Sequence, residues 1–305
     1  MRSATPPPGA SERLRPLPNS VTVVTTQAGD VLVNCPPETL KYLIASAITP
    51  PATILLPPDV PPGSELGSSG FVRRGINYAS VEFLIYFNYF VAGRQMQLIT
   101  VTTAQARRLQ TILEETINGP SDPASYGAFG WLQQECAAVA LYPPLGRAPK
   151  LDDMARIVSL EAGGGVLGPT TIRLEGESFV FDEAGIEVAR VSTRISEIAM
   201  PLVLAPPRPL QRQEVTLQFI GGSNGFDPEG ITTCFLAYLG PTVETQATLF
   251  DAAAYVYVRL SNLGLSTSHI AEVVLSHLHE DHLAGLPELI LMGSHRVRLV
   301  TSDLI

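Results

Sequence analysis

The feature that most constrains this chain is a dense group of histidines close to its carboxyl end. Residues 277–282 read His-Leu-His-Glu-Asp-His and hold three of the chain's five histidines. The apolar run 271–275 before them is typical of a buried strand, and Pro287 after them stands where a helix often begins. Imidazoles and carboxylates gathered at a strand-to-helix turn are the ligands that zinc and related metals prefer. The pattern predicts a metal site in an α/β fold.

Composition restricts the class of protein. The 305 residues are 45% hydrophobic and 16% charged, which allows two domains or one large domain with a substantial core. The formal charge of -9 argues against general electrostatic binding to nucleic acid. Cys35, Cys136 and Cys234 lie far apart and form no disulfide framework, as expected in a reducing compartment.

The amino-terminal segment and the most apolar run both argue against a membrane. Residues 1–20 are rich in proline and arginine and lack a continuous apolar stretch, which predicts a disordered lead-in rather than a secretory signal. Val81–Ala92 is the most hydrophobic later run, and it is shorter than the ~20 apolar residues that a membrane-spanning helix needs. We expect a buried helix or strand there, and a cytoplasmic protein.

Two regions with similar alternation of strands and helices are predicted, 21–203 and 214–305, joined by a proline-rich linker at 204–213. The first region has predicted strands at 21–25, 31–34, 52–56, 170–174, 178–182 and 186–191, and predicted helices at 37–48, 104–117, 130–141 and 151–161. The second has predicted strands at 215–220, 233–239, 247–251, 271–275 and 297–301, and helices at 252–263 and 286–290.

The order of these elements indicates an internal duplication. Strand 31–34, a helix and strand 52–56 match strand 249–251, a helix and strand 271–275, and 97–100 matches 298–301. The alternative is a chance likeness between two strand-helix-strand segments. If the halves are copies, residues 57–62 of the first read Pro-Pro-Asp-Val-Pro-Pro where the second has its histidines. We therefore predict that the first copy is degenerate and holds no metal.

The spacing of the histidines is suited to two ions. His277 and His279 are two residues apart and can point at one ion from an extended turn, whereas Asp281 and His282 turn toward a second position as the helix begins. Two metals about 3.5–4 Å apart activate water as a nucleophile near neutral pH.

At these residues the chain resembles the metallo-β-lactamase-fold superfamily, whose signature is His-x-His-x-Asp-His at such a turn. The resemblance implies an αββα sandwich, with the first half of that fold in 214–305. It implies that His277 and His279 bind the first metal, that Asp281 and His282 bind the second, and that Asp281 belongs to the catalytic centre. Asp251 resembles the aspartate that supports the site from behind the ligands, although Ala253 stands where glycine is usual.

Gly285-Leu286-Pro287 makes the resemblance nearest to the phosphodiesterase and ribonuclease Z branch. It implies a hydrolase that uses a metal-activated water on a phosphodiester or another ester bond. Two divalent ions are expected, zinc first, with iron and manganese as alternatives. The competing hypothesis is a non-catalytic metal-binding scaffold or sensor. The residues that select the substrate are unknown at this stage.

The ligand set is incomplete in this sequence. The superfamily adds a histidine, an aspartate and a last histidine downstream, whereas only His295 and Asp303 follow His282 here, and neither has the usual spacing. We expect a fragment of a longer protein, in which a missing carboxyl-terminal half or a partner chain covers the second sheet. The fragment alone is expected to be inactive. Residues 221–225 are read as a plain turn or as a loop at the mouth of the site.

Overall fold

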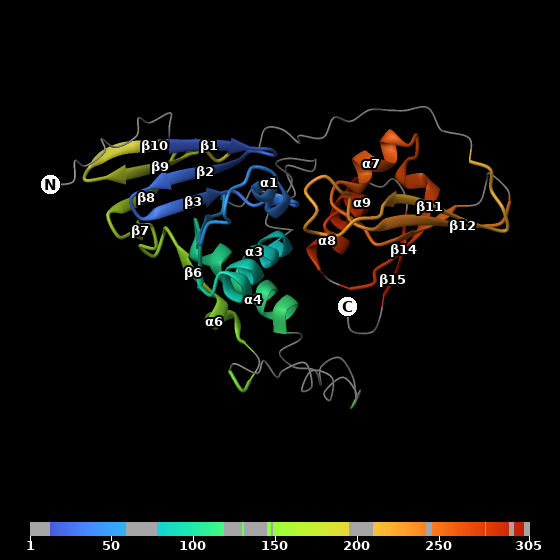
Figure 1. Cartoon of the computed structure of the whole chain (residues 1–305), viewed down its shortest axis with the longest axis horizontal. Helices are drawn as coiled ribbons and strands as arrows, with labels where there is room; N and C mark the ends of the chain where they lie inside the picture. Colours follow the sequence, from blue (N-terminus) through green and yellow to red (C-terminus); the bar gives the residue numbers. More distant parts are fainter. Residues whose placement is uncertain are drawn as a thin grey trace.

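The structure is a computed structural model that describes residues 13–58, 78–118, 130, 145–147, 149–194, 210–241, 246–277, 279–292 and 296–301. It is a mixed α/β fold with three sheets, which confirms the expected fold class. We call residues 13–194 the first half and 210–301 the second half, and the two lie side by side (Figure 1). No helix in these ranges is both long enough and apolar enough to cross a bilayer.

The first half contains two sheets. Its larger sheet has the order β1-β2-β3-β4-β5-β6, antiparallel as far as β3 and parallel from there. The strands are β1 Leu14–Leu17, β2 Val21–Thr26, β3 Gly29–Val33, β4 Thr53–Leu55, β5 Met96–Thr100 and β6 Ala155–Ser159. The smaller sheet is antiparallel and consists of β7 Val166–Leu167, β8 Thr170–Glu175, β9 Ser178–Glu183 and β10 Ile186–Ser192.

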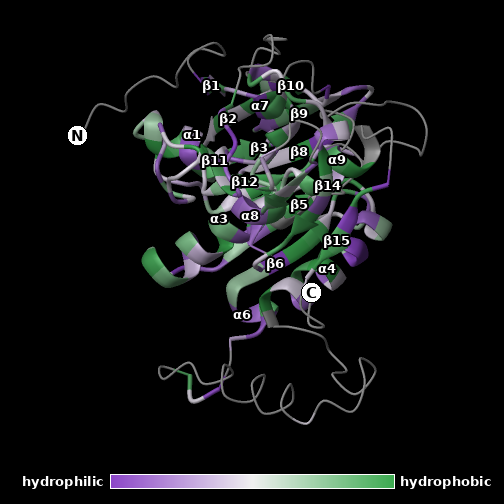
Figure 2. Cartoon of the chain, turned by 90° about the vertical axis from the view of Figure 1, so that its right-hand side faces the viewer, coloured by the Kyte–Doolittle hydropathy of each residue, from purple (hydrophilic) through white to green (hydrophobic). Residues whose placement is uncertain are grey.

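Strand alternation divides the core of the first half in two. Val31 and Val33 pack against the smaller sheet, whereas Leu32 packs against the helices. The helical layer contains α1 Thr39–Ala45, η2 Tyr78–Val81, α3 Glu82–Tyr86, the π-helical η3 Phe87–Val91, α4 Thr103–Asn118 and the short α6 Leu151–Met154. Seen from the side, hydrophobic residues concentrate along strands such as β5 and its edge neighbour β6 (Figure 2). This half is therefore a sheet-on-sheet sandwich with helices on one face.

The second half has one sheet, in the order β11-β12-β13-β14-β15. The strands are β11 Val215–Gly221, β12 Cys234–Leu239, β13 Ala247–Phe250, β14 Ile270–Val274 and β15 Arg298–Val300. The helices are α7 Val256–Asn262, η5 Thr267–His269, α8 Glu280–Leu283 and α9 Leu286–Met292. The first two strand pairs are antiparallel and the last two are parallel, as in the first five strands of the larger sheet.

The outer face of this second sheet is apolar and largely exposed to solvent. Val215, Leu217 and Phe219 of β11 are 62%, 52% and 61% exposed. The rings of Phe219, Phe235 and Phe250 follow one another across three strands, with centroid separations of 5.2 and 4.7 Å. The corresponding face of the larger sheet in the first half packs against β8 and β9. The expectation of an uncovered sheet face agrees with these exposures, and what covers it stays a prediction.

The backbone of the two halves repeats in detail. Asn34, Glu38 and Ala47 have positive φ angles of 71°, 65° and 53°, and Asp251, Tyr255 and Gly264 follow at the same spacing with 58°, 58° and 74°. The amide of Asn34 donates to Leu55 at 2.9 Å, and that of Asp251 donates to Val274 at 2.8 Å. Non-glycine residues rarely adopt positive φ, so this agreement is more specific than the strand order alone.

The helical layers of the two halves meet, and their contacts are reciprocal (Figure 1). Glu38, before α1, forms an ion pair of 3.2 Å with Arg259 of α7. In the opposite sense, Tyr42 of α1 and Tyr255, before α7, both accept hydrogen bonds from the side-chain amide of Asn19, at 2.6 and 2.7 Å. Glu38 and Tyr255 hold equivalent positions in the two halves, and so do Tyr42 and Arg259. The two contacts are therefore related to each other as in a two-fold interface.

Two predictions from the sequence were wrong in part. The helix predicted over 151–161 ends at Met154 and continues as strand β6, because Ile157 and Val158 pair with β5 and β-branched side chains favour strands. The lead-in predicted over 1–20 contains β1, whose Pro16 is tolerated at a sheet edge. The predicted helix 130–141, apart from Gly130, and linker residues 204–209 lie outside the described residues.

Candidate active site

Parallel pairing of β13 with β14 gathers the candidate site. The carboxyl ends of both strands lie at one edge of the sheet, so Asp251 after β13 comes beside Ser276 after β14. Asp251 has a left-handed backbone with φ of 58°, which aspartate tolerates better than most residues. His279 precedes α8, and Asp281 and His282 lie within it. We call residues 276–282 the histidine turn.

One buried carboxylate orients two imidazoles. Asp251 Oδ1 accepts from the amide of Ser276 at 2.8 Å, and its Oδ2 accepts from the Ser276 hydroxyl at 2.9 Å. The same Oδ2 lies 2.7 Å from Nδ1 of His282, which therefore carries the proton. Because the Ser276 hydroxyl donates to Asp251, it accepts from Nδ1 of His277, 2.9 Å away. Both rings are left with an unprotonated Nε2, the form that binds metals.

The free ring nitrogens converge. Nε2 of His277 lies 3.1 Å from Nδ1 of His279, and the ring centroids of His277 and His282 are 4.2 Å apart. Nε2 of His282 is 3.6 Å from Oδ2 of Asp281. Two nitrogens on a tetrahedral zinc with bonds of 2.0–2.1 Å would be about 3.3 Å apart. The four predicted ligands therefore meet as two donor pairs, His277 with His279 and Asp281 with His282.

The surroundings of the turn favour the neutral form of His277 but the protonated form of His282, from which a bound metal would displace a proton. Burial, then the neighbouring His282 and His279, lowers the pKa of His277. The hydrogen bond to Asp251 raises the pKa of His282. Burial opposes ionisation of Asp251, but bonds from His282 and Ser276 outweigh it and lower the pKa of that carboxyl. In the described ranges, no three His, Cys, Asp or Glu side chains already enclose one metal position, so the donor chemistry fits a metal while the ligand assignment stays a prediction.

The glycine-rich loop after β11 closes over Asp281. A Cβ on Gly225 would lie 2.6 Å from Oδ2 of Asp281, so any other residue at this position would displace the Asp281 carboxylate. The carboxamide oxygen of Asn224 accepts from the amides of Phe226 and Asp227, at 2.9 and 3.0 Å, which holds the loop in shape. Of the two readings left open for residues 221–225, the structure favours a loop at the mouth of the site.

A cavity of about 480 Å³ opens beside the histidine turn, between the two halves. We call it the composite cavity. It is lined by Phe83 and Tyr86 of α3, by Ser223, Asn224, Gly225, Phe226, Thr232 and Thr233 around the loop, and by His279, Asp281 and His282. Its volume lies within the range of about 300–1,000 Å³ that is common for ligand sites.

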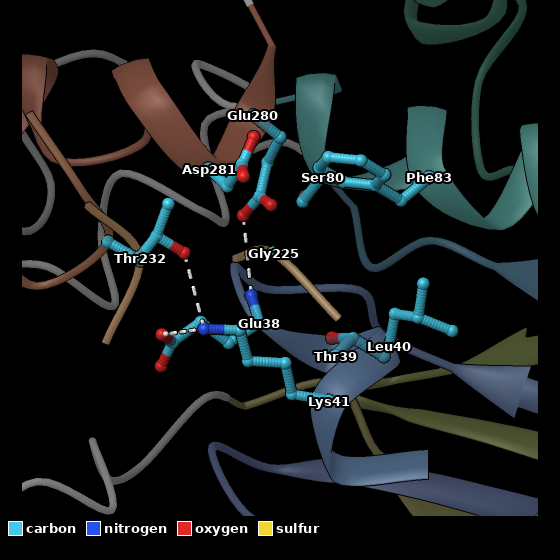
Figure 3. A pocket seen from close by; sticks show the side chains of 11 residues that line it. Glu38, Thr39, Leu40, Lys41, Ser80, Phe83, Gly225, Thr232, Glu280 and Asp281 are labelled. Atoms are coloured by element: carbon cyan, nitrogen blue, oxygen red, sulfur yellow. Dashed lines mark hydrogen bonds and ion pairs between the residues drawn. The ribbon is translucent and has the colours of Figure 1, made fainter. Parts of the chain in front are cut away.

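Next to this cavity, the interface between the halves holds buried charges (Figure 3). Glu280 of α8 accepts from the amide of Glu38, 3.3 Å away, and burial followed by the charge of Glu38 raises its pKa to about 8. The ammonium group of Lys41 donates to the Gly230 carbonyl at 2.9 Å and to the Thr232 hydroxyl at 3.3 Å. The space among these residues measures only about 10 Å³, enough for about one water molecule.

Sequence reasoning missed the contribution of the first half. In the sequence, Phe83 and Tyr86 belong to the apolar run 81–92, and nothing there distinguishes them or Glu82 as part of a site. Glu82 is buried, accepts from the hydroxyl of Tyr86 at 2.6 Å, and has one oxygen without a hydrogen-bond partner. His295 and Asp303 lie outside the described residues. Cys35 is buried, and desolvation raises the pKa of its thiol.

Comparison with known proteins finds similarity in the second half. Residues 215–304 match the family model described as Anti-Pycsar protein Apyc1. Over 106 residues the chain is 33% identical to "cGMP-dependent 3',5'-cGMP phosphodiesterase A" of Dictyostelium discoideum, a match that covers 35% of this chain and 11% of that protein. The chain therefore spans about a ninth of that relative.

A subclass B3 metallo-β-lactamase from a soil metagenome library, MEM-A1, matches with 8% identity over 85% of this chain and 74% of its own, at a TM-score of 0.20. That score is too low to show a shared fold. The informative matches are that of residues 215–304 to the Apyc1 model and that of 106 residues of the chain to a cyclic-nucleotide phosphodiesterase.

Proposed function

We propose that the second half holds two divalent metal ions, zinc first, and that the protein hydrolyses a phosphodiester bond of a cyclic nucleotide. The observation that carries the proposal is the Asp251 network, which leaves Nε2 of His277 and of His282 unprotonated beside the composite cavity. The similarity to a 3',5'-cGMP phosphodiesterase supports the substrate class.

The residues would divide the work. His277 and His279 would hold one ion, and Asp281 and His282 the other, while Asp251 and Ser276 keep the rings oriented. Ions bound there would acidify a water molecule and stabilise charge on the phosphate oxygens. In the reaction water adds to phosphorus, one phosphorus–oxygen ester bond breaks, and the sugar oxygen that leaves takes up a proton.

We further propose that the halves are tandem copies of one metallo-β-lactamase-like fold, a degenerate copy over 21–203 and the first half of a second copy over 214–305. The repeated positive-φ positions, the matched strand directions and the reciprocal contacts support this. Pro57 and Pro58 follow β4 where the histidine turn follows β14, so the first copy offers no imidazole at that place.

The proposal extends to this chain alone, in place of the expectation from its ligand set that it is inactive, and it is tested with the purified chain and 3',5'-cGMP. Product is separated chromatographically, and bound metal is counted by mass spectrometry. His277→Ala and His279→Ala should lose metal and turnover together, whereas His269→Ala, which removes a surface histidine far from the turn, should keep both. Equal trace metal in all four proteins would refute the metal site. Stoichiometric metal without hydrolysis would favour the scaffold or sensor hypothesis.

A further inference from the structure

The composite cavity has two chemically different ends. At one end lie His279, Asp281 and His282, the candidate metal ligands. At the other lie three aromatic rings, Phe83 and Tyr86 from the first half and Phe226 from the second. We call these three residues the aromatic wall. The ring centroids of Phe83 and His279 are 6.2 Å apart, so a ligand that touches one end reaches the other.

The aromatic wall is partly exposed and is held in place by its contacts. Phe226 is 54% exposed, and its ring meets that of Phe83 edge to face, with centroids 5.4 Å apart. The side chain of Asn224 holds the amide of Phe226, and the hydroxyl of Tyr86 is bonded to the buried Glu82. Ordered aromatic rings left open to water are typical of surfaces that a ligand or partner covers.

The remaining lining of the cavity is neutral and polar. Ser223, Asn224, Thr232 and Thr233 supply hydroxyl and amide groups, and no lysine or arginine is among the described lining residues. A negatively charged group would therefore find its compensating charge only at the histidine end. A planar ring against aromatic side chains, with hydroxyl and amide groups near its polar edge, is how proteins bind nucleobases.

We propose that the aromatic wall is a nucleobase subsite, in which the base of a nucleoside phosphodiester stacks against Phe83 and Phe226 while its phosphate lies at the histidine turn. This rests on the proposed function for the location of the phosphate, but not for binding of the base. The first half, which offers no histidines at the corresponding turn, contributes to catalysis by selecting the substrate through α3. The ring of Phe83 lies beside Asp281 and Gly225 where the halves meet (Figure 3).

Binding of guanosine, which has a base but no phosphate, tests the subsite without turnover. Isothermal titration of the full chain should give saturable binding. Phe83→Leu and Phe226→Leu keep apolar volume but remove the ring face, and each should raise the guanosine dissociation constant by roughly 5- to 100-fold, the range expected for loss of base stacking. Phe219→Leu, on the outer sheet face, is the matched control and should bind as the wild type does. His277→Ala should retain guanosine binding.

A specificity ratio separates this inference from the proposed function. The kcat/KM for 3',5'-cGMP divided by that for the methyl riboside 3',5'-cyclic phosphate, which lacks a base, should fall in Phe83→Leu, mainly through a higher KM for cGMP. Thermal melting shows whether each variant is folded. The subsite is overturned if cGMP is hydrolysed with an unchanged ratio, if the wild type does not bind guanosine, or if Phe83→Leu and Phe226→Leu bind guanosine as tightly as the wild type does. Guanosine binding through the wall without hydrolysis overturns the proposed function alone.

Discussion

The sharpest test of the site geometry is Asp251→Asn. The carboxylate accepts hydrogen bonds from the imidazole of His282 and from the hydroxyl of Ser276, which in turn accepts one from His277. In the variant one oxygen is replaced by an amide that donates. That amide faces Nδ1 of His282, so the ring must move its proton to Nε2, where it blocks metal binding. Because Ser276 then loses its acceptor as well, the second ring is disturbed too.

The expected loss of metal affinity follows from the number of imidazole rings that the substitution disturbs. Removing one partner that orients a metal-bound histidine costs 10- to 100-fold in metal affinity, which is about 1.4–2.8 kcal/mol. Asp251→Asn disturbs two rings, so we expect the upper end, near 100-fold. Ser276→Ala disturbs only His277 and should cost about 10-fold. The fold should tolerate the change, because Asn34 adopts φ of 71° at the matching position of the first half.

Zinc affinity is measured by competition with a chromophoric chelator at pH 7.5, with thermal melting to confirm folding. Asn34→Asp is the matched control, since it makes the reverse exchange in the first half and should leave zinc affinity unchanged. Zinc affinity in Asp251→Asn within two-fold of the wild type would refute the argument that the carboxylate selects the ring tautomers.

Three further outcomes are expected. Gly225→Ala should lower metal occupancy, because the new Cβ displaces Asp281, whereas Gly222→Ala has open space and should not; equal occupancy would contradict the close approach. Burial raises the pKa of Glu288 to about 7, so the wild type loses unfolding free energy as the pH rises above about 4.5. Glu288→Gln removes this loss. Its advantage in unfolding free energy over the wild type, measured with urea, should therefore be about 2 kcal/mol larger at pH 8 than at pH 5. Arg259→Met removes one of the two cations that pair with the Glu38 carboxylate, since Lys41 remains 3.3 Å from it, and should lower the unfolding free energy by about 1.5 kcal/mol; an unchanged urea midpoint would count against the interface.

Much of the fold was predictable because local signals were strong. Alternating apolar residues predicted β2 and β3, and Gly264, with φ of 74°, follows the end of α7 next to the predicted helix end at 263. The error at 151–161 arose because Ala155 onward reads as helix or strand by local pattern alone, and pairing with β5 decides it. Long-range pairing of that kind has no local signature.

The candidate site, like the fold, was predictable from the sequence only in part. The histidine turn carries its four candidate ligands within six residues, so its composition and spacing predicted a metal site, whereas Asp251 followed from the family resemblance. Phe83 and Tyr86 could not be found, because they reach the cavity only through contact between the halves. The sequence alone does not show whether an aromatic residue in an apolar run lines a cavity or lies in the core. Only the docking of α3 against the loop at Gly225 distinguishes them.

The reciprocal contacts of Glu38 with Arg259 and of Tyr42 with Tyr255 lie within one chain, so the interface between the halves does not dissociate on dilution. Two separate polypeptides meeting through this surface would fall apart at low abundance and lose any pocket built across it. A single backbone keeps the partners at an effective concentration on the order of millimolar. Formation of the pocket therefore does not depend on how much protein is expressed, and each histidine turn is always paired with one aromatic wall.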